Sequence, residues 1–210
     1  AETEDEVLNI RKNYNMTPVE LVEQAGLFDA KNIVAAHCVH LNDNDMEILK
    51  KHNVSIAHCP QSNMKLASGI SPVWTMIKKG INVSLGTDGV SSNNNLDMIE
   101  EMQTASYLQK LENKDATALP AYSCLKMATV NGAYALGMKD EVGCIKPGMK
   151  ADIILIDMDT PHMSPCYDPY SNIVYSGSGR DVKTVVANGR VLMENYSVKS
   201  LDEEKIMYDA

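Results

Sequence analysis

Three short apolar segments recur along the first half of the chain, and each leads into a residue that can bind a metal ion or carry a proton. The first segment is Ile33–His37, the second is Val54–His58, and the third is Ile81–Leu85, which is followed three residues later by Asp88. Nearly continuous apolar runs are typical of strands in a parallel sheet that is covered on both faces. The sequence therefore predicts parallel strands whose C-terminal ends carry these polar residues.

Helical patterns separate the apolar segments, which is the alternation of repeated βα units. Thr17 and Asn42 are typical N-cap residues, and Pro18 suits the first position of a helix. The stretch after His58 is rich in Pro, Ser and Asn and is predicted to be a loop that covers residues 60–69. The predicted helices cover residues 2–14, 17–25, 43–51, 72–79, 96–110 and 120–136.

The character of the sequence changes after Gly143. Strands are predicted over residues 151–157, 182–187 and 190–193, and Asn188-Gly189 is a strong signal for a two-residue hairpin turn between the last two. The Pro-rich stretch 161–169 connects the strands, and a final helix is predicted over residues 201–208. We therefore divide the chain into an α/β part, residues 1–142, and a smaller β part, residues 143–210.

The number of parallel strands limits the architecture. Catalytic groups at the C-terminal ends of parallel strands are typical of a (β/α)8 barrel, which needs eight strands and about 250 residues. This sequence of 210 residues offers three convincing strands of that kind. A parallel sheet of three strands would leave unpaired backbone groups at both edges. The α/β part is therefore predicted to be the C-terminal part of a (β/α)8 TIM barrel.

Charge and cysteine content restrict the partners and the compartment. The formal net charge is −9 and no basic cluster occurs, which argues against nucleic acid or an anionic membrane surface as a partner. No apolar stretch is long enough to span a bilayer. The five cysteines are odd in number and scattered without a C-x-x-C pair, so we predict reduced thiols in a cytoplasmic protein.

Asp88 and His37 are the strongest candidates for chemistry. An Asp in this position either caps a turn or acts at the end of a barrel strand as a metal ligand or a proton carrier, and its delivery by an apolar strand favours the second role. His37 ends a nearby strand, and a histidine near neutral pH can orient or deprotonate a metal-bound water. Glu2 has no such signal and, by composition alone, is an ordinary surface acid.

The remaining histidines are weaker candidates. His58 either bonds the loop that follows it or lines the substrate site, and the residues leave both roles open. His40 and His52 are predicted to be solvated, and His162 is predicted to be structural. Cys38 and Cys59 follow strand-end histidines, but successive strand residues point to opposite faces. These two cysteines are therefore predicted to be packing residues.

Three motifs resemble the amidohydrolase superfamily, namely Ala35–Leu41, His58–Gly69 and Leu85–Asn95. The nearest branch is that of the 5-methylthioadenosine/S-adenosylhomocysteine deaminases, and triazine hydrolases and guanine deaminases stand close to it. The segment Lys146–Ile154 resembles the point where the chain of that family leaves its barrel for a small β-sandwich. The resemblance therefore implies an α/β fold made of the C-terminal part of the barrel plus strands of a small β-sandwich domain.

The resemblance implies a mononuclear zinc or iron site, or another divalent metal, held by an H-x-H pair, a further His and an Asp. Asp88 matches the Asp ligand, and the other ligands have no match in this chain. Ala1-Glu2-Thr3 is similar to the tail of the fifth-strand motif, so that Glu2 matches the catalytic acid that contacts the substrate ring. His37 matches the histidine that assists the hydrolytic water. Asn63 and Ser92 are implied to line the pocket, together with His58.

The implied activity is metal-dependent hydrolytic deamination of an adenine-type nucleoside, a small-molecule substrate such as 5-methylthioadenosine or S-adenosylhomocysteine. Metal binding would lower the pKa of a water molecule to about 7. Guanine deamination and the hydrolysis of triazines are alternatives at the same kind of site. An inactive fragment without most metal ligands is a third alternative. The resemblance also implies either a homo-oligomer or an N-terminal half that completes the barrel.

Overall fold

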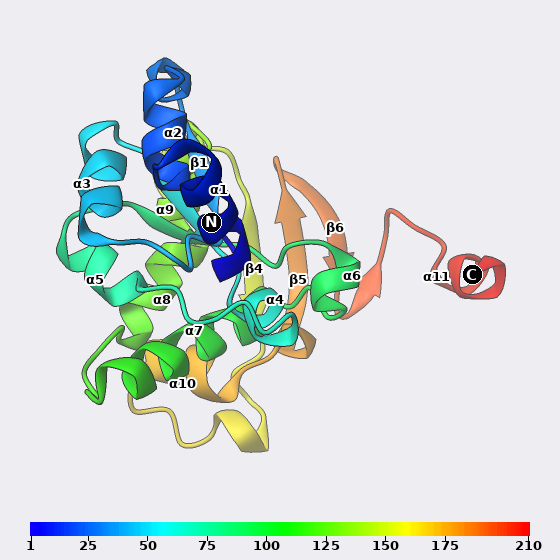
Figure 1. Cartoon of the computed structure of the whole chain (residues 1–210). Helices are drawn as coiled ribbons and strands as arrows, with labels where there is room; N and C mark the ends of the chain where they lie inside the picture. Colours follow the sequence, from blue (N-terminus) through cyan, green and yellow to red (C-terminus); the bar gives the residue numbers. More distant parts are fainter.

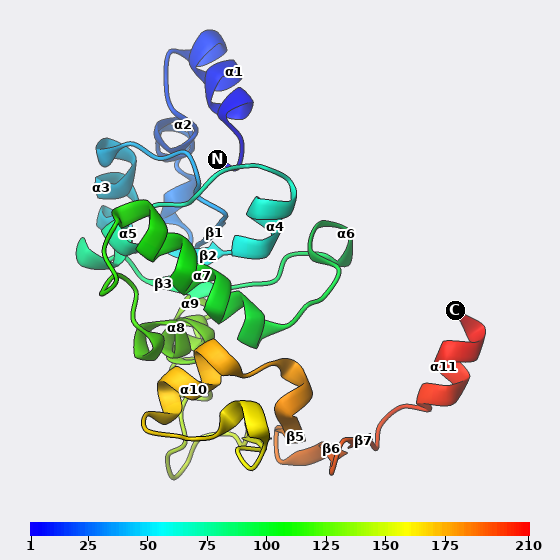
Figure 2. The same cartoon turned by 90° about the horizontal axis from the view of Figure 1, so that it is seen from below.

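A parallel sheet lies inside the first part of the computed structural model, which describes residues Ala1–Ala210. Its strands are β1 (Val34–Ala36), β2 (Ser55–His58) and β3 (Val83–Leu85), hydrogen-bonded in the order β1-β2-β3. Both strand pairs are parallel. Figure 1 labels β1 among the helices of this part, and Figure 2 labels all three strands. The predicted βα alternation and the predicted parallel pairing are therefore confirmed.

Three helices of the first part begin close to where the sequence predicts them. In each, the N-cap side chain accepts a hydrogen bond from the third helical residue, whose own side chain bonds back to the cap, so that two free backbone N–H groups are satisfied. These helices are α1 (Glu4–Tyr14) after Thr3, α2 (Pro18–Gln24) after Thr17 and α3 (Asp43–Lys51) after Asn42. A single 3-10 turn, η1 (Leu27–Asp29), follows α2.

The predicted loop over residues 60–69 is wrong in its first half. This stretch begins with helix α4 (Pro60–Lys65), which has Pro60 at its first position. Proline needs no hydrogen-bonded N–H there, so a composition typical of loops is compatible with a helix start. The next helix, α5 (Val73–Lys78), lies within the predicted range.

Two of the longer predicted helices differ from the structure, one at its ends and the other in its middle. After β3 a short helix, α6 (Val90–Asn93), precedes α7 (Met98–Asn113). The long helix starts after Leu96, which has a left-handed φ of 56°, and runs to Asn113 instead of Lys110. The predicted helix 120–136 is divided at Thr129, where φ is −129° and ψ is −96°. Its two pieces are α8 (Ala121–Ala128) and α9 (Val130–Ala135).

The second part contains an antiparallel sheet with the strand order β4-β5-β6-β7. The hairpin turn at Asn188-Gly189 has positive φ at both residues, 47° and 75°, as a type I′ turn requires. Helix α10 (Pro169–Ser176), which the sequence analysis did not predict, packs against α7 and α8. The strands are β4 (Ile153–Ile156), β5 (Val182–Ala187), β6 (Arg190–Glu194) and β7 (Ser197–Val198), and the 3-10 turns are η2 (Pro161–Met163) and η3 (Gly179–Asp181).

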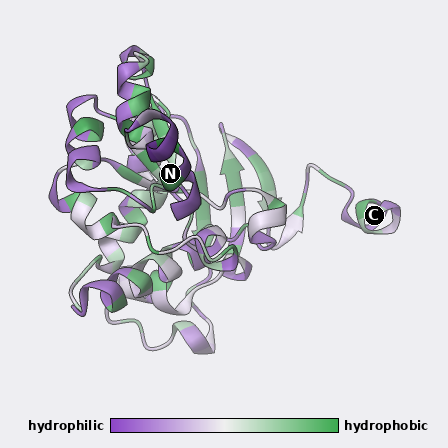
Figure 3. Ribbon diagram, viewed as in Figure 1, coloured by the Kyte–Doolittle hydropathy of each residue, from purple (hydrophilic) through white to green (hydrophobic).

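The C-terminal helix α11 (Glu203–Asp209) stands away from the rest of the chain, as Figures 1 and 2 both show. None of its residues is buried. Colouring by hydropathy shows a hydrophilic exterior on helices such as α1 and hydrophobic stretches along the strands (Figure 3). None of the helices is both long enough and apolar enough to cross a lipid bilayer.

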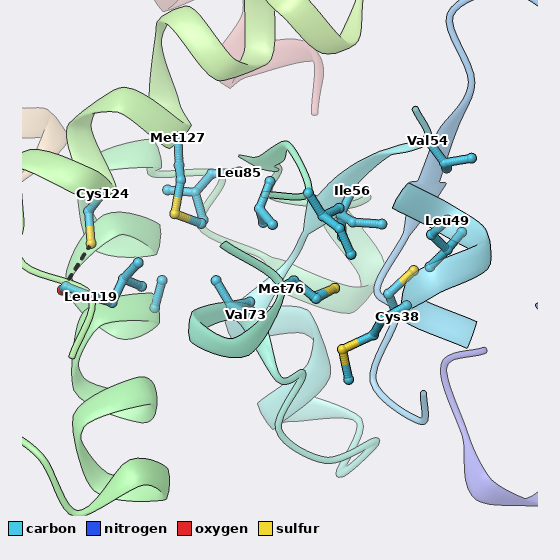
Figure 4. Close-up of a cluster of buried hydrophobic side chains, with 14 of the residues drawn as sticks. Cys38, Leu49, Val54, Ile56, Val73, Met76, Leu85, Leu119, Cys124 and Met127 are labelled. Atoms are coloured by element: carbon cyan, nitrogen blue, oxygen red, sulfur yellow. Dashed lines mark hydrogen bonds between the residues drawn. The ribbon is translucent and has the colours of Figure 1, made fainter. Parts of the chain in front are cut away.

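One hydrophobic cluster of 21 buried residues joins the strands to the helices around them. It includes Val174 of α10, so a helix from the second part completes the core of the first. Burying one Leu or Ile side chain contributes about 2 kcal/mol, so this core holds the strand ends in place. Figure 4 shows side chains from α3, β2, α5, β3 and α8 packed together, among them Leu49, Ile56, Met76, Leu85 and Met127.

Candidate active site

The strand register brings the predicted polar residues to one edge of the parallel sheet. Ala36 pairs with Ala57 and His58 pairs with Leu85, so the three strands end side by side. The hydrogen bonding continues past the strands, since the His37 N–H donates to the Ala57 carbonyl at 2.9 Å. The Gly86 N–H likewise donates to the His58 carbonyl at 2.9 Å. His37, His58 and the segment before Asp88 are therefore held by the sheet itself.

The backbone turns sharply at both strand ends. His37 has a φ of 63° and Asp88 a φ of 64°, and neither residue is a glycine. Left-handed backbone is uncommon for such residues and costs on the order of 1 kcal/mol, so it persists where the surroundings determine it. Strained positions of this kind concentrate at functional sites. The two residues therefore share an edge of the sheet and a left-handed conformation, although 12 other non-glycine residues of the chain also have positive φ.

His37 is oriented by Asn63, which lies on α4. Its Nδ1 lies 2.9 Å from the Asn63 Oδ1, and an amide oxygen can only accept, so Nδ1 carries the hydrogen. In the neutral ring Nε2 is then the basic nitrogen. This Nε2 lies 3.8 Å from the Glu2 Oε2, and the two side chains are 17% and 25% exposed. The imidazole therefore presents its free nitrogen towards a carboxylate that solvent can still reach.

Glu2 reaches the site although it lies far from it in the sequence. Its Oε1 accepts a hydrogen bond from the Ser68 hydroxyl at 3.0 Å. The preceding carbonyl, that of Ala1, accepts from the Val39 N–H at 3.0 Å, which ties the start of the chain to the segment after β1. These contacts fix Glu2 in the site, whereas the sequence by itself indicated an ordinary surface acid.

Asp88 is bound by three hydrogen-bond donors. Its Oδ2 accepts from the Ser62 hydroxyl at 2.7 Å and from the Ser92 hydroxyl at 2.8 Å, and its Oδ1 accepts from the Gly89 N–H at 2.7 Å. The bond from Ser62, followed by those from Ser92 and Gly89, lowers the pKa of the Asp88 carboxyl, and burial opposes this change. Asp88 is therefore an ionised acceptor at neutral pH.

His58 is buried without a hydrogen bond. The residue is 1% exposed, and neither ring nitrogen has a partner. The expectation that its ring bonds the segment after it is therefore wrong. Burial lowers the pKa of His58 to about 3, so the ring is neutral. The Asn63 amide nitrogen is also buried and unpaired. Unsatisfied buried polar groups are rare and indicate a missing partner.

The other histidines have structural partners. His40 and His52 were predicted to be solvated, and this prediction is wrong. The His40 Nε2 lies 2.8 Å from the Ser68 carbonyl, and the His52 Nε2 lies 2.9 Å from a Glu23 carboxylate oxygen. Both contacts join segments that are distant in the sequence. His162 bonds Asp181 at 2.9 Å, in agreement with its predicted structural role.

Cys38 and Cys59 are buried packing residues, as predicted. They are 2% and 5% exposed. Burial raises the pKa of the Cys38 thiol to about 11 and that of the Cys59 thiol to about 12. Neither thiol is therefore ionised at neutral pH, and neither offers a thiolate ligand.

Two site residues, Ser62 and Ser68, were not identified from the sequence. Both are buried, at 0% and 7% exposure, and each donates its hydroxyl to a carboxylate of the site. The signal that could have found them is their place in the segment between His58 and Gly69, which follows a strand end. Serines are common in such segments, so their type alone does not distinguish a site residue from a turn residue.

The residues of this chain do not form a complete metal site. No group of three or more His, Cys, Asp or Glu side chains lies close enough to hold a metal ion. Asp88 is the metal ligand that the sequence resemblance implies for this chain, and its oxygens accept three hydrogen bonds from the protein. Zinc sites need three or four protein ligands. A single carboxylate does not meet this requirement.

Comparison with known sequences gives consistent results. The model of the amidohydrolase family matches residues 1–192. A 5-methylthioadenosine/S-adenosylhomocysteine deaminase of Pelotomaculum thermopropionicum is 54% identical over 210 residues, which is 100% of this chain and 48% of that protein. A 5'-deoxyadenosine deaminase of Methanosarcina barkeri is 54% identical over 209 residues, again 100% of this chain and 48% of that protein. The chain spans about half the length of these curated relatives.

Solved structures are similar over nearly the whole chain. An adenosine deaminase from Xanthomonas campestris with bound zinc superposes with a TM-score of 0.95 at 32% identity, over 99% of this chain and 47% of that one. An atrazine chlorohydrolase from Arthrobacter aurescens complexed with zinc gives 0.90 at 26% identity, over 100% and 46%. Guanine deaminase of E. coli gives 0.82 at 28% identity, over 92% and 46%.

Proposed function

The chain belongs to the amidohydrolase family, and from this premise we propose that it is part of a hydrolytic deaminase that acts on adenine-type nucleosides. The names of its relatives, which include deaminases of 5-methylthioadenosine and 5'-deoxyadenosine, support this substrate class. The observations that support the proposal are the contact of Glu2 with His37 and the position of Asp88, which follows β3 at the same edge of the parallel sheet. A carboxyl, an imidazole and a second carboxylate are the groups that a hydrolytic deamination needs for its proton transfers.

We propose that the parallel sheet is the C-terminal part of a (β/α)8 barrel, and that residues 143–210 contribute strands to a small β-sandwich. The open edge of β1 supports this, since Val34 is 40% exposed although it is an apolar strand residue. The coverage of the solved relatives, near half of their length, supports it as well. The proposed boundary at residues 142 and 143 precedes β4, the first antiparallel strand.

Asp88 is proposed to carry the proton of the attacking water. Water adds to the ring carbon that bears the amino group, and the ionised carboxylate of Asp88 takes the proton that is released. When the adduct collapses, Asp88 passes this proton to the departing amino group, which leaves as ammonia. The hydroxyls of Ser62 and Ser92 hold the carboxylate in place for both transfers.

Glu2 and His37 are proposed to act on the ring and on the water. Glu2 would donate a proton to the ring nitrogen next to the reacting carbon, and the hydroxyl proton of the adduct restores it. The Nε2 of His37 is free to accept a hydrogen bond from the water, because Nδ1 is bonded to Asn63. A proton on that nitrogen would stabilise the charge that develops on the oxygen.

Asn63, Ser92 and His58 are proposed to line the substrate pocket. The unpaired ring of His58 and the unpaired amide nitrogen of Asn63 support this, because a bound base could supply the missing partner. Ser92 is half-buried and stands next to Asp88, which suits contact with the same ligand.

The full-length protein is also proposed to hold a divalent metal, zinc or iron, with Asp88 as the ligand that this chain contributes. The zinc in related solved structures supports this. The chain itself supplies one carboxylate, so the remaining ligands would have to come from the rest of the protein. Guanine or a triazine is the alternative substrate, which the similarity to guanine deaminase and atrazine chlorohydrolase favours.

The experiment is an assay of ammonia release by the full-length protein. The substrates are 5-methylthioadenosine, S-adenosylhomocysteine, 5'-deoxyadenosine and guanine, and chloride release is followed for atrazine. We expect kcat/KM to be at least tenfold higher for the adenine nucleosides. A preference for guanine or atrazine would overturn the substrate class, and the absence of turnover on all five would overturn the function.

Replacing the proton carrier tests the mechanism. The change Asp88→Asn keeps the shape of the side chain but removes the proton acceptor, so kcat should fall at least a thousandfold. The control is Asp115→Asn, because the side chain of Asp115 bonds only Thr117 in an exposed loop. Asp115→Asn should keep kcat within twofold. More than a tenth of the wild-type kcat in Asp88→Asn would contradict the proposed role.

A further inference from the structure

Glu101 is a buried carboxyl that the proposed reaction does not use. It lies on α7, in the first turn of the helix, and is 0% exposed. A carboxyl group taken out of water loses several kcal/mol of hydration unless partners replace the water. Its position is therefore sustained by specific contacts, and these contacts lead to the candidate active site.

Each oxygen of Glu101 binds a different segment of the chain. Oε2 accepts a hydrogen bond from the backbone N–H of Gln61, in the first turn of α4, at 3.2 Å. Oε1 accepts from the side-chain amide of Asn93, which ends α6. The Asn93 Oδ1 in turn accepts from the N–H groups of Asn95 and Leu96 at 3.0 and 2.9 Å. Glu101 thus joins the segment after β2 to the segment after β3.

These two segments carry the hydroxyls that bind Asp88. Ser62 follows Gln61 directly, and Ser92 precedes Asn93 directly. Both serines donate to the same carboxylate oxygen, Oδ2 of Asp88. A shift of either segment would therefore move one of the two donors away from Asp88.

We propose that Glu101 is a positioning residue that holds Ser62 and Ser92 against Asp88 by binding the backbone and side chain next to each of them. This inference rests on the role proposed for Asp88. Glu101 does not touch the reacting groups, and it acts through the two segments.

The chemistry of the contacts explains why an acid occupies this position. Both partners, the Gln61 N–H and the Asn93 amide, are hydrogen-bond donors. An ionised carboxylate accepts on both oxygens, whereas a glutamine accepts on one and turns an N–H group towards the other donor. Glu101→Gln should therefore break one of the two connections although its shape is nearly unchanged.

Reversing the donor and acceptor roles gives a test with rescue. Glu101→Gln alone places two donors against each other, and Asn93→Asp alone places two carboxylates against each other. The double variant Glu101→Gln/Asn93→Asp restores a bond, since the new amide donates to the new carboxylate. That carboxylate can still accept from the N–H groups of Asn95 and Leu96 through its other oxygen.

The three variants are made in the full-length protein, and two properties are measured. We expect each single variant to lower kcat at least tenfold with less than a threefold change in KM, and the double variant to recover to within threefold of the wild-type kcat. Hydrogen exchange of residues 59–66 and 89–97 should be faster in the single variants and should return to the wild-type rate in the double variant.

The control is a second buried polar residue on the same helix. Gln109 is also 0% exposed, but it bonds Ser71 and Trp74 instead of the segments near Asp88. Gln109→Ala should destabilise the protein and leave hydrogen exchange of residues 59–66 and 89–97 unchanged. If Glu101→Gln does not fold, Asn93→Ser removes the same connection from its other side.

The outcomes separate this inference from the proposed function. Unchanged kcat and unchanged exchange in the single variants would overturn the inference, and so would a double variant that is as impaired as the single variants combined. If the wild-type protein has no deaminase turnover, the proposed function fails, and hydrogen exchange still decides the role of Glu101.

Discussion

The Nδ1 of His37 and the Oδ1 of Asn63 lie 2.9 Å apart, so an amide on α4 determines which nitrogen of the imidazole carries the hydrogen. In an active site a histidine depends on such a partner, because its two nitrogens have different chemistry. Here the partner leaves Nε2 free on the side where Glu2 lies. The orientation of His37, which follows β1, therefore depends on a residue of α4, the helix that follows β2.

Removal of this partner should reduce the rate without unfolding the protein. In Asn63→Leu the ring of His37 loses its fixed tautomer, so we expect kcat to fall about 10- to 100-fold, the usual range for residues that orient a functional histidine. Steady-state kinetics of the full-length protein provide the measurement. Asn44→Leu is the control, because Asn44 is exposed and its side chain bonds only Glu20. A kcat within twofold of wild type in Asn63→Leu would show that the bond has no role in turnover.

Replacing His58 should show whether this histidine has a structural role or binds the substrate. Since neither ring nitrogen has a partner, His58→Leu removes no hydrogen bond and should change the free energy of unfolding by less than about 0.5 kcal/mol. The same change should lower kcat/KM at least tenfold if the ring contacts the substrate. His52→Leu should behave in the opposite way, because it breaks the bond to Glu23 and leaves the site intact. Normal kinetics with a large loss of stability in His58→Leu would assign His58 to the core.

The pH dependence of stability should report the ionisation of Glu101. Burial raises the pKa of Glu101 from 4.5 to about 7, the neighbouring acids Asp97 and Glu100 raise it further, and the bonds from Gln61 and Asn93 oppose the rise. Between pH 4.5 and about pH 7 the Glu101 carboxyl is protonated in the folded protein and ionised in the unfolded chain. The free energy of unfolding therefore falls as pH rises through this range and becomes level above about pH 7. Each pKa unit is worth about 1.4 kcal/mol, so Glu101 should contribute a fall of up to about 3 kcal/mol.

This contribution is measured by chemical denaturation of the wild-type protein and Glu101→Gln from pH 4.5 to pH 8. The difference between the two should follow the predicted slope, because glutamine does not ionise. Glu112→Gln, at the exposed end of the same helix, should reproduce the wild-type slope. A wild-type slope that Glu101→Gln leaves unchanged would mean that Glu101 is not the group that titrates.

The 210-residue chain should not bind a catalytic metal by itself. It holds no group of three potential ligands, so we expect less than about 0.1 zinc or iron per chain after dialysis, and no deaminase turnover. The full-length protein should hold about one metal per chain and should lose turnover on treatment with a chelator. Elemental analysis of both proteins is the measurement. Stoichiometric metal in the 210-residue chain would mean that these residues form a site of their own.

Local signals in the sequence were sufficient for much of the fold. Thr17-Pro18 and Asn42 predicted two helix starts, and the strand 182–187 and the turn at Asn188-Gly189 were predicted at the positions that the structure has. Caps, turns and apolar runs act through neighbours a few residues away, so a short stretch of sequence contains all the information they need. The same runs predicted that His37 and Asp88 follow nearby strands, and the structure places them after β1 and β3, with β2 between.

Long-range contacts were decided by the tertiary structure alone. The burial of Glu101 depends on the segments that pack against it, and the sequence analysis did not identify the helix at Pro60 or the division at Thr129. The hydroxyl of Ser62 reaches Asp88 across 26 positions, and that of Ser68 reaches Glu2 across 66. The sequence therefore determined which residues stand at the strand ends. Only the folded chain determined which side chains hold them there, because hydrogen bonds form between atoms that are close in space, whatever their separation along the chain.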